Sequence, residues 1–359
     1  MTGPTALLAL PILFALLAPR PDQHAVKCFA AQVGCVSCLH GFCPYELAEL
    51  GLSFHWHSNS TTRRSFGWEA GAKEVEEVNW AEGRHLWVLI HGFEGQWPLE
   101  WVQLLREKLL KAKNEVLVVQ WTLGTAYPFS YPQALVNGLA VAKFTAAFLS
   151  HLVQKQNRSL SSVNMIGFSL GAHLAGAVGT QLQGKIRQVV GLDPCDMLHD
   201  EDSDYGMQPS NAHIVQAIHT HGFGFGTMRR MGDLDFYVNG GGEQLGCGLF
   251  SRRHWPLSRS YDLIKIFGCN HLRAGALFAD SIDNLSCRYQ ALPWDMANGE
   301  YNNLCASSCD KEEGCLQMGY WLNVSTKQRG AFWLPTRADD GVTAPNSQYC
   351  QPLIECPDN

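Results

Sequence analysis

Short apolar runs alternate with longer segments of helical periodicity through the first half of the chain. The apolar runs predict strands at Leu52–His57, Leu86–Ile90, Glu115–Trp121, Val163–Gly167 and Val189–Leu192. Two segments between them, Glu100–Lys111 and Pro132–Gln154, have the apolar spacing of helices. Strands that alternate with helices favour a mostly parallel central sheet flanked by helices, and therefore an α/β fold.

The two ends of the chain depart from this pattern. Leu7–Ala18 is an apolar run at the start of the chain, too short to span a bilayer comfortably, and it predicts a signal peptide within residues 1–25. A buried N-terminal helix is the alternative. Residues 26–50 are dense in cysteine, and the pattern after residue 200 is looser and rich in glycine and cysteine. We expect residues 26–359 to form one domain.

Composition narrows the class of protein. Hydrophobic residues make up 46% and charged residues 17%, so the chain can build a sizeable core. A formal net charge of -6 gives no reason to expect a nucleic-acid partner. The 13 cysteines, several in close pairs, suit an oxidising compartment, and their odd number leaves one thiol unpaired within the chain. Glycosylation sequons stand at Asn59, Asn157, Asn284 and Asn323, so we expect a secreted, extracellular protein.

The clearest chemical motif is Gly167-Phe168-Ser169-Leu170-Gly171. A predicted strand precedes the serine, and small residues follow it, as a helix packed closely on a sheet requires. Such a turn lifts the serine hydroxyl above the sheet edge, with the helix N-terminus directed at it. An ordinary glycine-rich turn is the alternative, but the context favours a nucleophile.

A nucleophilic serine needs a histidine base, and that histidine needs a carboxylate to orient it. Asp193 ends the next apolar strand, so it would lie at the same sheet edge as Ser169; a turn role before Pro194 is its alternative. The residues alone leave several histidines open as the base, with a slight preference for His271 in a loop-like segment ahead of a helix: His199, His213, His219, His221, His254 and His271. His219 and His221 also alternate on a predicted strand, where a metal pair is conceivable but a structural role is commoner.

Several segments in order along the chain resemble the pancreatic lipase family. They are Ile90–Phe93, Gly167–Gly176, Gly191–Pro194, Ile218–Thr220, Leu234–Gly241, Cys269–Arg273, Phe278–Ile282 and Met318–Trp321. The resemblance implies an α/β-hydrolase fold with a disulfide-bracketed lid. It also implies that Ser169 is the nucleophile, His271 the general base and Asp193 its orienting acid. The backbone N–H groups of Phe93 and Leu170 would form the oxyanion hole.

The resemblance also implies how the cysteines pair. Cys247 and Cys269 would bracket the lid, and the other family bridges would be Cys28–Cys35, Cys287–Cys305 and Cys309–Cys315. Cys195 has no obvious family partner, so it is the candidate for the free thiol. The bracketed segment, residues 248–268, interleaves large apolar side chains with arginine and lysine, a mixture suited to a flap that covers an apolar site or lies on lipid. An ordinary amphipathic surface helix is the alternative.

The chain departs from the family pattern in four places. Phe168 stands where the family often has histidine, outside the triad. The segment between His219 and Leu234 is short, as in phospholipases A1 of the family, whereas the lid is long, as in its triacylglycerol lipases. The family's calcium site is poorly matched at Gln208 and Asn211, so we expect no cofactor and no metal site, although Asp200, Asp202 and Asp204 remain candidates for calcium. We expect no C-terminal lipid-binding β-sandwich and therefore no colipase partner.

These features predict a secreted serine lipase that hydrolyses the ester bonds of glycerolipids, such as triacylglycerol or a related neutral lipid, at a lipid interface. One alternative is a phospholipase A1 that cleaves the sn-1 ester. Another is a non-catalytic lipid-binding or yolk-type storage protein. Since Ser169, Asp193 and His271 are all present, the catalytic hypotheses are favoured.

Overall fold

The computed structural model describes residues 25–29, 33–39, 41–59, 63–67, 75, 77–93, 100–125, 131–196, 206–247, 261–283, 288–296 and 315–337. Most of its strands join one eleven-stranded sheet, in the order β12-β11-β13-β10-β9-β8-β7-β5-β6-β3-β4. The bounds of these strands are β3 Ser53–His57, β4 Arg63–Gly67, β5 Leu86–Ile90, β6 Glu115–Gln120, β7 Val163–Phe168, β8 Gln188–Leu192, β9 Ile214–His219, β10 Leu234–Val238, β11 Gln290–Pro293, β12 Leu316–Gln317 and β13 Gly330–Leu334.

The middle of the sheet is parallel and its two edges are antiparallel. The strands from β6 through β5, β7, β8, β9 and β10 to β13 pair in parallel, whereas β3 and β4 at one edge and β11 and β12 at the other pair antiparallel. All residues of β5, β7, β8, β9 and β10 are buried, as expected for strands covered on both faces. The expected mostly parallel α/β sheet is therefore present.

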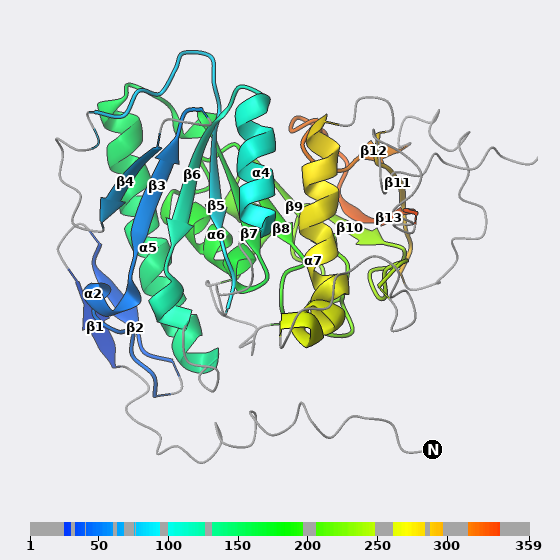
Figure 1. Cartoon of the computed structure of the whole chain (residues 1–359), viewed down its shortest axis with the longest axis horizontal. Coiled ribbons are helices and arrows are strands. Elements are labelled where there is room, and N and C mark those ends of the chain that lie inside the picture. The colour runs from blue at the N-terminus through cyan, green and yellow to red at the C-terminus, as the bar shows by residue number, and fades with distance from the viewer. Residues whose placement is uncertain are drawn as a thin grey trace, which may run out of the picture.

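Helices cover both faces of this sheet. The longer ones are α4 Glu100–Lys111, α5 Tyr131–Lys155, α6 Leu170–Gln181 and α7 Tyr261–Asp283, and the short ones are α2 Leu47–Leu50, η1 Thr122–Thr125, η2 Leu160–Ser162 and η3 Pro209–Asn211. One apolar core lies between α5, α6 and the sheet, and a second lies between α4, α7 and the opposite face. Figure 1 shows α4 and α7 side by side in front of the central strands.

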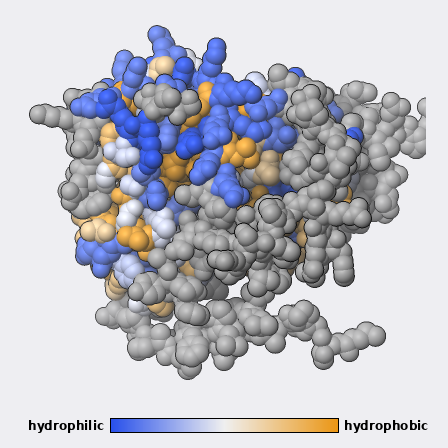
Figure 2. Space-filling view, viewed as in Figure 1, coloured by the Kyte–Doolittle hydropathy of each residue, from blue (hydrophilic) through white to orange (hydrophobic). Residues whose placement is uncertain are grey.

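Two surface features complete the fold. Hydrophilic side chains predominate over α4 in the space-filling view, so its apolar stripe faces the sheet (Figure 2). The cysteine-dense segment forms an antiparallel pair, β1 Val26–Cys28 and β2 Cys35–Ser37, and holds the disulfides Cys28–Cys35 and Cys38–Cys43.

The helix α5 is long and apolar enough to cross a membrane, but 78% of its most apolar window is buried, as expected of a core helix.

Candidate active site

Ser169 lies at a sharp turn between β7 and α6. Its backbone adopts φ 55° and ψ -121°, a combination that few residues other than glycine adopt and that needs surrounding structure to hold it. The flanking glycines are needed for space, because a Cβ on Gly167 would overlap the carbonyl of Gly171, and a Cβ on Gly171 would overlap the carbonyl of Ile90. The turn therefore places Ser169 at the carboxyl end of β7 and at the N-terminus of α6.

Asp193 leaves the neighbouring strand at the same edge. Phe168 pairs with Leu192 across β7 and β8, so the residues that follow them, Ser169 and Asp193, lie next to each other. The Asp193 carboxylate is fully buried, and its Oδ1 accepts hydrogen bonds from the backbone N–H groups of Thr220 (2.7 Å) and His221 (3.0 Å). These two donors fix the orientation of the carboxylate and leave Oδ2 for another partner.

That partner is His271. Its Nδ1 lies 2.5 Å from Asp193 Oδ2, and the imidazole is 4% exposed. The predicted loop around His271 is wrong: the residue lies inside α7, which runs without a break from Tyr261 to Asp283. The rings of Phe168 and Phe225 pack beside the imidazole, with centroids 4.5 Å and 5.6 Å away. The acid and the base proposed from the sequence are thus brought together.

A buried free thiol lies near Ser169. No hydrogen bond joins Ser169 to His271 in the part of the chain that the structure describes, and the Ser169 side chain interacts with the thiol of Cys195. Cys195 is buried and free, as expected, and Tyr131 Oη lies 3.1 Å from its sulfur. Burial raises the pKa of the Cys195 thiol to about 11, so the group stays neutral near pH 7.

The predicted oxyanion donors flank the same turn. Leu170 is the first residue of α6, so its N–H has no acceptor within the helix. The segment that holds Phe93 packs on the turn: a Cβ on Gly92 would lie 3.0 Å from Ser169 Cβ and 3.4 Å from Leu170 N. His91 anchors this segment, since its carbonyl accepts from Trp121 Nε1 at 3.1 Å. Burial lowers the pKa of His91 to about 4, so this imidazole is neutral at physiological pH.

Among the other candidate histidines, His219 has structural surroundings. His219 is fully buried between the carbonyl of Thr227 (2.8 Å) and the carboxylate of Asp235 (3.0 Å). His221 does not share its strand as predicted, because β9 ends at His219 and the next two N–H groups turn to Asp193. Burial lowers the pKa of His221. His213 is exposed, and His199 and His254 lie outside the described residues.

The two residues at the poorly matched calcium position, Gln208 and Asn211, bond to each other. The side-chain oxygen of Asn211 accepts from the backbone N–H of Gln208 at 2.6 Å, and its nitrogen donates to Thr180 at 2.8 Å. Asn211 therefore takes part in the capping of η3. Within the described ranges, no group of three or more His, Cys, Asp and Glu residues could hold a metal. The remaining candidates, Asp200, Asp202 and Asp204, fall outside those ranges.

The structure places only some of the remaining sequence candidates. It contains the Cys247–Cys269 disulfide, and Cys315 is disulfide-bonded. The sequon asparagines Asn59, Asn157 and Asn323 are exposed. Other positions lie outside the described residues: the signal segment up to residue 24, Cys287, Cys305, Cys309, Asn284 and the expected lid from residue 248 to residue 260.

Sequence reasoning missed several polar groups around Asp193 and His271. The backbone N–H groups of Thr220 and His221 hold Asp193, and Gln244 and Asn270 hydrogen-bond each other beside them (2.7 Å). Thr220 and Asn270 lie in segments that carry the family resemblance, Ile218–Thr220 and Cys269–Arg273. Gln244 carried no signal, because a single glutamine in a glycine-rich stretch matches no motif.

Known lipases are similar to this chain over about two thirds or more of its length. The chain is 30% identical over 275 residues to lipoprotein lipase from Gallus gallus, which covers 74% of this chain and 55% of that protein. It is 33% identical over 240 residues to lipase member H from Mus musculus (66% and 50%) and 29% identical over 320 residues to pancreatic triacylglycerol lipase from Ictidomys tridecemlineatus (82% and 65%). The matched region thus spans between half and two thirds of each of these relatives.

Among solved structures, an α/β serine hydrolase without a lid from Xanthomonas campestris is similar at 10% identity and a TM-score of 0.34, covering 74% of this chain and 95% of that chain. The family model named Lipase matches residues 43–341, which include Ser169, Asp193 and His271. A match over most of the sequence shows that this chain belongs to the lipase family.

Proposed function

We propose that this protein is a secreted serine lipase that hydrolyses the carboxylic ester bonds of glycerolipids, with triacylglycerol or a related neutral lipid as its substrate. The observation that carries the catalytic part is the buried contact of 2.5 Å between Asp193 and His271, beside the strained turn that presents Ser169. Because Asp193 engages Nδ1, the imidazole keeps Nε2 as the nitrogen that takes and returns a proton.

In the proposed reaction, the Ser169 hydroxyl hydrogen-bonds to His271 Nε2 when an ester binds. Its oxygen attacks the carbonyl carbon while its proton moves to His271 Nε2, and the carbonyl oxygen takes the negative charge between the N–H groups of Phe93 and Leu170. The bond to the leaving alcohol then breaks as that alcohol receives the proton. Water attacks the acyl-enzyme, gives its proton to His271, and the carboxylic acid leaves as Ser169 recovers its proton.

Exposed apolar side chains support action at a lipid interface. Phe223 is 84% exposed, Leu245 is 51% exposed, and Phe225, which packs beside His271, is 43% exposed. These residues belong to the loop after β9 and to the segment before Cys247, the two segments that flank the proposed base. Large apolar groups gathered near a site suit a surface that meets lipid.

The relatives and the length of one loop support two substrate classes and one non-catalytic alternative. Four of the similar proteins are pancreatic triacylglycerol lipases, which favours neutral lipid. The short loop after β9 favours the second candidate, a phospholipase A1 that cleaves the sn-1 ester. Inactive pancreatic lipase-related protein 1 from Canis lupus familiaris is 31% identical over 264 residues, so a binding or storage role is the third candidate.

Secretion is supported by disulfides, among them Cys28–Cys35, Cys38–Cys43 and Cys247–Cys269. The exposed sequons are available to glycosylation. We expect the protein in the culture medium of expressing cells, with the predicted signal peptide removed. Mass spectrometry of the mature N-terminus tests this, and retention of the intact segment contradicts it.

Fatty-acid release by the purified secreted protein from triolein emulsion and from phosphatidylcholine vesicles tests the activity. We expect release mainly from triolein, and its loss in Ser169→Ala, whereas Ser161→Ala, at an exposed serine before β7, serves as the matched control. Release mainly from phosphatidylcholine supports the phospholipase. If neither lipid nor p-nitrophenyl butyrate is cleaved, the catalytic proposal is wrong.

A further inference from the structure

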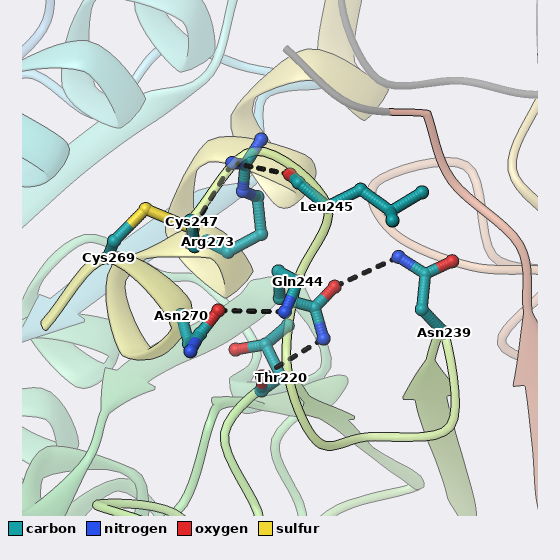
Figure 3. The surroundings of a disulfide bond; sticks show 8 residues. All are labelled: Thr220, Asn239, Gln244, Leu245, Cys247, Cys269, Asn270 and Arg273. Carbon is teal, nitrogen blue, oxygen red and sulfur yellow. Dashed lines mark hydrogen bonds between the residues drawn. A yellow bond between two sulfur atoms is a disulfide. The ribbon is translucent and has the colours of Figure 1, made fainter. Parts of the chain in front are cut away.

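The segment that leads into the Cys247–Cys269 disulfide carries a buried polar side chain that the proposed reaction does not use. Gln244 is 4% exposed and lies three residues before Cys247. Figure 3 shows it between α7, the loop after β9 and the end of β10. A buried amide in this position raises the question of what its hydrogen bonds hold in place.

The side chain of Gln244 uses both of its donors and its acceptor. Nε2 donates to the carbonyls of Thr220 (3.0 Å) and Val238 (2.9 Å), and Oε1 accepts from Asn239 Nδ2 (3.1 Å). The backbone N–H of Gln244 donates to Asn270 Oδ1 at 2.7 Å. One residue therefore joins three segments that are far apart in the sequence.

Two of these segments carry the proposed acid and base. Thr220 donates its backbone N–H to Asp193 Oδ1 at 2.7 Å, so fixing Thr220 fixes one side of the carboxylate. Asn270 immediately precedes His271, whose Nδ1 meets the other side of the same carboxylate at 2.5 Å. Gln244 thus closes a ring of contacts around the Asp193–His271 pair.

The outer side of this network is anchored. Asn239 exchanges two hydrogen bonds with Thr336 beyond β13, at 2.7 Å and 2.9 Å. Arg273 lies two residues after His271 on α7. Its guanidinium donates to the carbonyl of Leu245 (3.2 Å) and contacts the sulfur of Cys247 (3.3 Å). The segment that carries Gln244 is therefore held between the sheet edge and α7, and it can hold Thr220 and Asn270 in fixed positions.

We propose that Gln244 is a positioning residue, which sets the distance and orientation between Asp193 and His271 by holding Thr220 and Asn270 together. This inference rests on the proposed ester hydrolysis. A purely structural glutamine would stabilise the fold equally well, but removing it would leave the rate per folded enzyme unchanged. The two roles therefore differ in kcat measured per active site, and in the hydrogen bond between Asp193 and His271 itself.

Two substitutions separate these roles. Gln244→Met keeps the approximate size of the side chain without its donors, and Gln244→Glu places a carboxylate against the Thr220 and Val238 carbonyls. Gln216→Met is the matched control: Gln216 is also a buried amide, bonded to Gln188 (3.1 Å) and to the carbonyl of Gly319 (3.2 Å), away from Asp193 and His271. Kinetics use p-nitrophenyl butyrate, with the active fraction counted by a fluorophosphonate, and NMR records the downfield proton between Asp193 and His271.

We expect both Gln244 variants to lose about 10- to 100-fold in kcat with little change in KM, because small displacements of catalytic groups cost rates of this size. The downfield resonance should shift or broaden in these variants only. If kcat and the resonance in Gln244→Met equal those of Gln216→Met, Gln244 is not a positioning residue. If the wild type hydrolyses no ester, the proposed function fails, while the resonance still tests the role of Gln244.

Discussion

Replacing Asp193 by asparagine isolates the contribution of one oxygen atom. Asp193 Oδ1 accepts from Thr220 at 2.7 Å and His221 at 3.0 Å, and an amide oxygen in Asp193→Asn keeps both bonds. The amide nitrogen then faces His271 Nδ1, where Oδ2 lay at 2.5 Å. Two donors cannot share that contact, so the imidazole must carry its proton on Nε2, where it cannot receive the proton of Ser169.

The expected loss is large because the wrong tautomer removes the base. A change of this kind in a Ser-His-Asp enzyme lowers kcat about 10⁴-fold, and since each tenfold is about 1.36 kcal/mol, the barrier rises by about 5 kcal/mol. Folding should survive, since the variant is isosteric and the buried N–H donors stay satisfied. Asp193→Ala lacks this merit, because it leaves two buried donors unpaired at about 1–3 kcal/mol each.

Hydrolysis of p-nitrophenyl butyrate, together with thermal unfolding, is the assay. Asp235→Asn is the matched control, since Asp235 is a fully buried carboxylate that also meets a histidine, His219 at 3.0 Å, and accepts a backbone N–H, from Met231 at 2.7 Å. We expect Asp235→Asn to lower the stability of the fold without the loss of about 10⁴-fold in kcat. A folded Asp193→Asn enzyme within about tenfold of the wild-type rate would refute the assigned roles.

Three further predictions test the surroundings of the site. The Cys195 thiol, buried and with its pKa raised to about 11, should resist iodoacetamide at neutral pH until the protein unfolds; rapid alkylation of the folded protein, seen by mass spectrometry, would count against the described packing. Burial lowers the pKa of His91 in the folded protein to about 4, below its unfolded value of about 6.5. The stability that this group contributes is therefore present above about pH 6.5 and is lost as the pH falls from there toward 4. His91→Gln should reduce the change in the free energy of unfolding across that pH window, measured by urea unfolding at each pH, and an unchanged pH dependence would contradict this. Phe223→Asp should slow triolein hydrolysis while sparing p-nitrophenyl butyrate, since Phe223 is 84% exposed, and equal losses on both substrates would argue against a lipid-facing role.

The central elements could be predicted because their patterns are strong and local. Leu86–Ile90 and Glu100–Lys111 have the predicted bounds, and α5 extends one residue beyond the prediction at each end. In such segments the burial pattern and the element type agree, so tertiary contacts reinforce the local preference. The glycine-flanked Ser169 and the strand-ending Asp193 were found in the same way.

The places where prediction failed depend on contacts between distant residues. Asn270 beside Cys269 favours a loop locally, yet α7 continues through both, because the disulfide to Cys247 and the contact of His271 with Asp193 outweigh a weak propensity. Likewise β9 ends at His219 because the following N–H groups bond to a carboxylate rather than to a strand. The short strands β11 and β12 hold four and two residues, too few for a period to show.

The most direct test of the account is active-site labelling of the secreted protein with a fluorophosphonate, followed by peptide mass spectrometry and ester hydrolysis on the same sample. We predict one label per molecule, on Ser169, with hydrolysis of triolein lost in proportion to labelling and no label on Ser169→Ala. Undiminished hydrolysis by fully labelled protein, or hydrolysis that falls as another residue is labelled, would contradict the assignment of Ser169 as the nucleophile.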